Sequence, residues 1–95
     1  MKYFSWDNEK NKSLKEERNI SFEEIVFHIE KEHILDIVQH PSQGKYKGQK
    51  IFILNIDDYA YLVPFVESEQ GIFLKTIIPS RKATKRYLGG QRKDE

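Results

Sequence analysis

The chain of 95 residues has no cysteine, one methionine, three prolines and five glycines. The absence of cysteine excludes disulfides, thiolate metal sites and a cysteine nucleophile, and it fits a reducing cytoplasm. No apolar run approaches the roughly 20 residues that a membrane-spanning helix needs, and residues 1–6 lack the basic and apolar regions of a signal peptide. We therefore expect a single cytoplasmic domain, residues 1–95, with no membrane segment.

The few glycines match no phosphate-binding loop. Gly89 with Gly90, and Gly44 with Gly48, fit neither the Walker nor the dinucleotide spacing, and no GxSxG sequence occurs. These absences disfavour nucleotide hydrolysis and serine-hydrolase chemistry. No two histidines lie at i and i+4 on one helix and no cysteine assists them, so we expect no metal site.

What the chain does have is an uneven distribution of charge. The net charge is +1, but residues 16–36 contain seven acids and two bases, whereas residues 75–93 contain seven bases and no acid. A basic end of this kind can attract a phosphate backbone. Two solvated helix faces of opposite sign explain the same pattern, and both interpretations stay open.

Local signals predict three helices. Asp7 is suited to cap a helix from Asn8 to about Glu17, which Asn19 would end. A second helix, from Phe22 to about Lys31, follows a capping box of Ser21 and Glu24 and has apolar residues at i, i+3, i+4 and i+7. Ser80 can cap a third helix, Arg81 to about Leu88, ended by Gly89 and Gly90, and residues 89–95 are expected to form a flexible tail.

The segment between the second and third helices has the pattern of β-strands. Short runs rich in β-branched and aromatic residues predict strands at Ile34–Gln39, Ile51–Ile56, Tyr59–Val66 and Ile72–Ile78. The short connections require antiparallel hairpins, and Pro64 predicts a bulge or strand end. We therefore expect an α+β fold with two N-terminal helices, a four-stranded antiparallel sheet and a short C-terminal helix.

Three places carry candidate functional residues. His40 ends a strand at a glycine-containing loop, where it could transfer a proton, although a structural role is the alternative. On the last strand, alternation places Phe73, Lys75 and Ile77 on one face, so an aromatic ring and a cation could hold a base and a phosphate. A lysine lying over a half-buried strand is the alternative there. Four cations also crowd the third helix near its N-terminus, which is an anion site: Arg81, Lys82, Lys85 and Arg86.

Two segments resemble the BrnT family of toxins from bacterial type II toxin–antitoxin systems, whose fold is similar to RelE-type ribonucleases. The first comprises Phe4-Ser5-Trp6-Asp7, Lys10-Asn11 and Ile20-Ser21-Phe22-Glu23-Glu24, which is similar to the family's FxWDxxKN and (V/I)SFEE. The second is residues 77–86, IIPSRKATKR, which is similar to the family's IISARKATKRE.

The resemblance implies a metal-independent endoribonuclease that arrests growth by cutting RNA, has no cofactor and is neutralised in a complex with a cognate antitoxin. It implies that Arg81 stabilises the phosphate, and that Lys82, Lys85 and Arg86 hold the RNA backbone. Lys10 matches the family's opening lysine, and a structural contact with Asp7 or with a helix carboxylate is an equal alternative. Arg18 stands where the family commonly has histidine and could act only as a cation, and Lys75 and His40 complete the candidate catalytic set.

Two other classes of function remain. A non-catalytic binding module would hold RNA or an acidic protein segment on the same basic face and would leave RNA uncut. A protein-interaction domain would pair its exposed strand edges with a partner chain.

Overall fold

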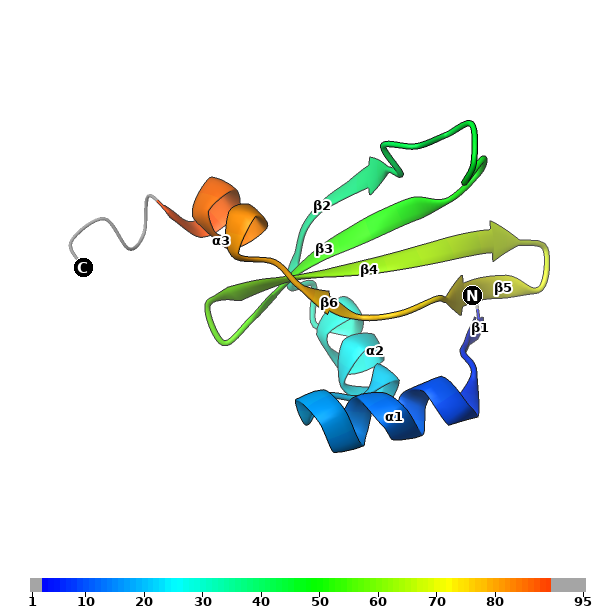
Figure 1. The fold of residues 1–95 in the computed structure, drawn as a ribbon, viewed down its shortest axis with the longest axis horizontal. Coiled ribbons are helices and arrows are strands. Elements are labelled where there is room, and N and C mark those ends of the chain that lie inside the picture. The colour runs from blue at the N-terminus through cyan, green and yellow to red at the C-terminus, as the bar shows by residue number, and fades with distance from the viewer. Residues whose placement is uncertain (1–2, 90–95) are drawn as a thin grey trace.

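The computed structural model describes residues 3–89, which form a mixed β-sheet with three helices (Figure 1). The predicted α+β class is confirmed. The predicted flexible tail lies outside the described residues beyond Gly89. None of the helices within residues 3–89 is long and apolar enough to cross a membrane. In chain order the elements are β1 (Tyr3–Ser5), α1 (Asn8–Arg18), α2 (Phe22–Glu30), β2 (Ile34–Gln39), β3 (Lys50–Ile56), β4 (Tyr59–Ser68), β5 (Gly71–Leu74), β6 (Ile78–Pro79) and α3 (Arg81–Leu88).

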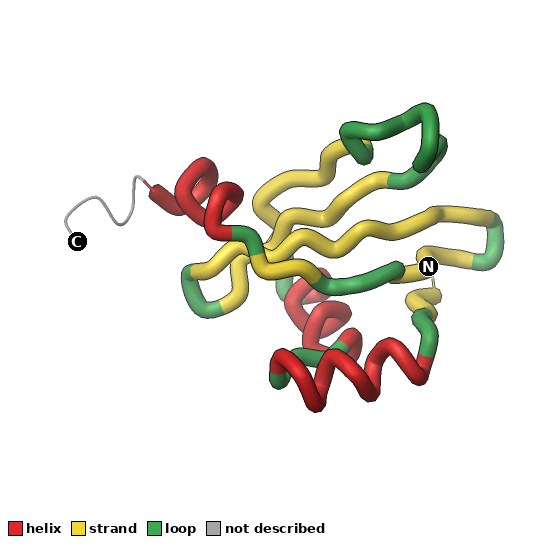
Figure 2. Tube along the Cα trace, in the orientation of Figure 1, coloured by secondary structure: helices red, strands yellow, loops and turns green. Residues whose placement is uncertain are grey.

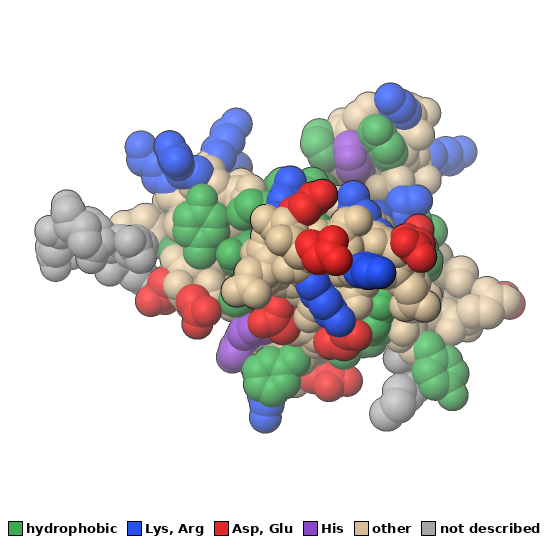
Figure 3. Space-filling model, turned by 60° about the horizontal axis from the view of Figure 1, so that its bottom comes forward, with side chains coloured by type: hydrophobic (Ala, Val, Ile, Leu, Met, Phe, Trp, Pro, Cys, Tyr) green, Lys and Arg blue, Asp and Glu red, His purple; other side chains and the backbone are tan. Residues whose placement is uncertain are grey.

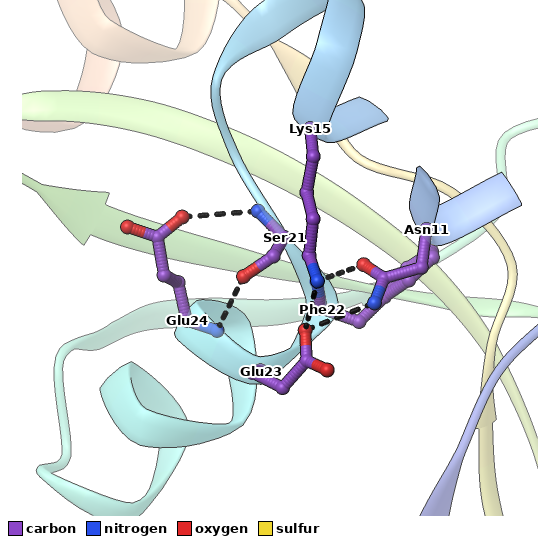
Figure 4. Close-up of polar contacts among 6 residues, drawn as sticks. All are labelled: Asn11, Lys15, Ser21, Phe22, Glu23 and Glu24. Carbon is purple, nitrogen blue, oxygen red and sulfur yellow. Dashed lines mark hydrogen bonds and ion pairs between the residues drawn. The ribbon is translucent and has the colours of Figure 1, made fainter. Parts of the chain in front are cut away.

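All three helices begin at the predicted residues because each has its own cap. Asp7 caps α1, and Asn19 ends it in the left-handed conformation with φ 56°. Ser21 and Glu24 form the predicted capping box of α2, each side chain accepting a hydrogen bond from the other's backbone N–H (Figure 4). Ser80 caps α3 through its hydroxyl.

Asn11 connects the first two helices. Its side chain is 5% exposed, its Oδ1 accepts the Phe22 N–H at 2.8 Å, and its Nδ2 donates to Glu23 Oε1 at 2.9 Å (Figure 4). The hydrogen bond from Asn11 is the main reason why the pKa of Glu23 is lowered. One buried amide therefore fixes the angle at which α2 leaves α1.

The sheet differs from the predicted four antiparallel strands. Its order is β1-β5-β4-β3-β2, β6 pairs with β4, and β1 is parallel to β5. β1 was not predicted because three residues are too few to show alternation. Gly71 lies opposite Tyr3 with φ 145°, and a Cβ there would collide with the Tyr3 carbonyl oxygen. Glycine at this position allows the parallel pairing.

The prediction of a bulge or strand end at Pro64 was wrong. Pro64 pairs with Ile51 without any shift of register inside the ten-residue strand β4. The predicted strand Ile72–Ile78 is interrupted instead, since β5 ends at Leu74 and β6 begins at Ile78. The Pro64 carbonyl accepts the Lys75 N–H at 2.8 Å, so its proton-free nitrogen points toward the gap between β5 and β6.

The helices cover the two faces of the sheet unequally. α1 and α2 pack on one face, where the largest buried side chains include Phe22, Ile25 and Leu54 (Figure 1). α3 packs on the other face, with Ala83 against Ile51 and Ile53. Figure 2 shows α3 beyond one end of the sheet and the loop between β2 and β3 at the other end. Much of the α3 face therefore has no helix over it.

Candidate nucleic-acid interface

An open groove runs between α3 and strands β2 and β3. Its volume is about 470 Å³. The floor consists of apolar side chains from three adjacent strands: Val38, Ile51, Ile53 and Leu62. Ser80, Lys82 and Arg86 lie on the α3 side, and Gln39 and Pro41 lie on the β2 side.

A buried threonine holds α3 beside the sheet. The Thr84 hydroxyl donates to the Ser80 carbonyl at 2.7 Å and accepts the Ala60 N–H at 2.8 Å. The Ser80 N–H in turn donates to the Ala60 carbonyl at 3.0 Å. Because the Thr84 hydroxyl accepts the buried N–H of Ala60 in β4, it fixes the position of α3 relative to that strand.

α3 carries four cations and no acid, and it presents two of them to the groove. Lys82 and Arg86, at i and i+4, line the groove. Arg81 and Lys85 are exposed but are not among the lining residues. In Figure 3, Lys and Arg side chains gather on α3 and on the β2–β3 loop, whereas acidic and basic side chains are mixed over α1.

Asp36 and Tyr87 form a polar pair in the groove that the sequence reasoning missed. The Tyr87 hydroxyl donates to Asp36 Oδ2 at 2.8 Å. This hydrogen bond, followed by burial and the Asp36 charge, raises the pKa of Tyr87. The two residues are 51 positions apart in sequence. The available signal was an aspartate inside the apolar run Ile34–Val38.

His40 lies in the loop at the β2 end of the groove. Its ring lies against Tyr46 with centroids 4.2 Å apart, and Nδ1 accepts the Ser42 N–H at 3.1 Å. This hydrogen bond occupies Nδ1, so Nε2 is the ring nitrogen left to meet a ligand.

The predicted juxtaposition of Phe73 and Lys75 is confirmed. Lys75 Nζ lies 5.8 Å from the centroid of the Phe73 ring, which is 39% exposed on the α3 face of the sheet. The predicted position of Ile77 was wrong. The chain leaves the sheet after Leu74, and Ile77 is buried against α1 and α2.

Arg18 and Lys10 lie away from the α3 groove. Both line a smaller hollow of about 200 Å³ beside α1, together with Thr76 and Ile78. Arg18 Nη1 donates to the Ile77 carbonyl at 2.9 Å and so ties the end of α1 to the segment between β5 and β6. The structure therefore separates the candidate residues into those on and near the groove, the Phe73–Lys75 pair at the end of β5, and the pair on α1.

No family model, curated protein or solved structure matches the chain. The chemistry of the groove is therefore argued from its own residues.

The groove combines groups that bind an anion with groups that can move a proton. Lys82 and Arg86 can hold a phosphate, since guanidinium and ammonium groups both donate charge-assisted hydrogen bonds. Tyr87 and Asp36 can pass a proton along a short hydrogen bond. Within residues 3–89, no three His, Asp or Glu side chains are placed to hold a metal ion together.

Proposed function

We propose that this protein binds RNA in the groove beside α3 and cleaves it, acting in the cytoplasm as the endoribonuclease toxin of a type II toxin–antitoxin pair. The observation that carries the proposal is the position of Lys82 and Arg86 on one groove wall, next to the Asp36–Tyr87 pair. The identification as a toxin rests on the resemblance to the BrnT family.

Cleavage would use the ribose 2′-OH as the nucleophile. The 2′-OH passes its proton to the Tyr87 oxygen while the Tyr87 proton moves to Asp36. The 2′-oxygen bonds to phosphorus, the bond to the 5′-oxygen breaks, and the leaving oxygen takes a proton from a water molecule. The hydroxide so formed takes up the proton held by Asp36, which restores the carboxylate. The products are a 2′,3′-cyclic phosphate and a 5′-hydroxyl. Arg86 and Lys82 stabilise the negative charge that develops on the phosphate.

The antitoxin would cover the same groove in a hetero-oligomer. Its contacting segment should be acidic, because the charged side chains that α3 presents are all basic. Its apolar side chains would cover the floor formed by Ile51 and Leu62.

Cleavage of a labelled single-stranded RNA by the purified protein in EDTA tests the proposal. Wild type should release fragments ending in 2′,3′-cyclic phosphate, and Arg86→Ala should slow the reaction roughly 10²-fold, the usual effect of removing one transition-state donor. Tyr87→Phe should slow cleavage at least about tenfold while RNA still binds. Lys12→Ala, an exposed lysine on α1, is the matched control. Arg81→Ala, made in parallel, tests the residue that the resemblance favours.

A non-catalytic RNA-binding module is the second candidate. The engagement of His40 Nδ1 by the Ser42 N–H favours it, because that contact gives one nitrogen of the candidate base a structural role. RNA that is bound but stays intact with wild type would support this module and contradict the nuclease. Expression in a bacterial host should then leave growth unchanged, whereas the nuclease should arrest it.

A further inference from the structure

We propose that the β2–β3 loop, residues 40–49, forms the second wall of the RNA site, where His40 and Tyr46 stack with one base and Lys45 and Lys47 hold the flanking phosphates. This inference rests on the proposed binding of RNA and names the part of the site that faces α3. It assigns His40 to binding.

The loop is held in a defined conformation by Gln43. Its Nε2 donates to the carbonyls of His40 at 2.8 Å and Gln49 at 3.2 Å, and its Oε1 accepts the Gly48 N–H at 3.3 Å. The Tyr46 N–H donates to the Ser42 carbonyl at 2.8 Å. A loop with these internal bonds loses less entropy when it binds a ligand than a free loop does.

The aromatic pair on this loop is pre-arranged. The ring centroids of His40 and Tyr46 lie 4.2 Å apart, with an angle of 32° between the ring planes, and the Ser42 N–H fixes the imidazole. Both side chains are only half-buried. Aromatic side chains at the surface stack with unpaired bases of single-stranded RNA, whose π-faces are all available.

The loop is basic as well as aromatic. Lys45 and Lys47 are exposed, Lys45 Nζ lies 5.4 Å from the Tyr46 ring centroid, and Lys50 follows at the start of β3. No acid occurs between Asp36 and Asp57 in the sequence. Cations beside aromatic side chains are the combination with which proteins hold the backbone of a single strand while its bases stack.

The loop borders the groove through Pro41. Pro41 and Gln39, the last residue of β2, flank His40 and line the same groove as Lys82 and Arg86 of α3. A strand of RNA crossing the groove would meet cations on both sides and apolar side chains beneath its bases. An acidic amphipathic peptide could also use the floor and the cations, but it would have no need for the stacked aromatic pair.

Fluorescence anisotropy with a ten-nucleotide RNA tests this placement. The RNA carries 2′-O-methyl riboses, so the 2′-oxygen cannot attack and binding is measured without cleavage. Tyr46→Ala should weaken binding about tenfold, and Tyr46→Phe, which keeps the ring, should restore most of that loss. Lys45→Ala should lower the slope of log K against log salt by roughly 0.7. Phe27→Ala, an aromatic 52% exposed on α2, and Lys12→Ala are the matched controls.

A 2-aminopurine base in the same RNA gives a second measurement with the wild-type chain, so the test does not depend on whether Tyr46→Ala folds. Its fluorescence should be quenched on binding if the base stacks with an aromatic ring. Tyr46→Ala that binds like wild type, or absence of quenching at saturation, would overturn the loop proposal while RNA binding stands. Failure of wild type to bind RNA would overturn both proposals. Displacement of the RNA by polyglutamate equally from wild type and Tyr46→Ala would point to an acidic protein as the ligand and contradict the loop proposal.

Discussion

Asn11 explains, at the scale of single residues, why some of the residues behind the BrnT resemblance stand where they do. Its amide satisfies the Phe22 N–H and reaches Glu23, and the Phe22 ring lies against Trp6 with centroids 5.6 Å apart. The capping box of Ser21 and Glu24 is in the same segment. These side chains therefore build the junction of α1 and α2, and they need no catalytic role.

Asn11→Ala should lower the free energy of unfolding by about 2 kcal/mol, because it leaves the buried Phe22 N–H without an acceptor. Urea unfolding followed by far-UV circular dichroism measures the change. Asn8→Ala, an exposed position on the same helix, is the control and should change stability by less than about 0.5 kcal/mol. An Asn11→Ala protein as stable as wild type but unable to cut RNA would contradict the structural role.

At the scale of elements, the sequence predicted the helices better than the sheet. The caps of α1, α2 and α3 are formed by residues within a few positions of each helix start, so they are visible as local patterns. The parallel strand β1 depends on a partner at the far end of the chain, and the division between β5 and β6 depends on Arg18 and Pro64. Short-range patterns do not contain such contacts.

Gly71→Ala should detach β1 from the sheet. An alanine would have to adopt φ 145° with its Cβ against the Tyr3 carbonyl, so we expect a loss of about 2 kcal/mol or more. Trp6 is the only tryptophan and directly follows β1, so its emission should shift to longer wavelength. Gly44→Ala is the matched control, since a Cβ there meets no atom within 4 Å. Unchanged Trp6 emission and stability in Gly71→Ala would contradict this role for the glycine.

The candidate site shows the same limit of sequence reasoning. The cations of α3 and the pair of Phe73 and Lys75 could be found in the sequence because the members of each set lie within a few positions of one another. The contact of Asp36 with Tyr87, and the position of the β2–β3 loop across from α3, join residues far apart in the chain. The sequence could therefore name candidate residues on α3 and at His40, but not the contact between Asp36 and Tyr87 that lies in the groove.

At the scale of the whole molecule, titratable groups far from the groove couple folding to pH. His28 on α2 and His33 after it share a short contact, Nδ1 to Nδ1 at 2.8 Å, so one ring donates and the other accepts. The two histidines line a small hollow together with Asp57 and Asp58 from the β3–β4 turn. Glu24 lies one turn before His28 on α2. Burial, followed by the charge of His33, lowers the pKa of His28, while Asp57 and Glu24 oppose the shift.

The sign of the pH dependence follows from that lowered pKa. The unfolded chain protonates His28 near its ordinary pKa of 6.5, whereas the folded protein resists the proton. The unfolded state therefore binds more protons in the window below pH 6.5, and the stability that His28 contributes above this pH is lost as the pH falls through its folded-state pKa.

Urea unfolding at pH 7.5 and 5.5 should show a smaller difference in stability for His28→Gln than for wild type. Asn8→Ala, which removes no titratable group, should keep the wild-type difference. Equal differences in wild type and His28→Gln would show that other groups set the pH dependence. The smaller difference would place the acid-sensitive contact at the end of α2, so that lowering the pH could destabilise the fold without changing a group in the groove.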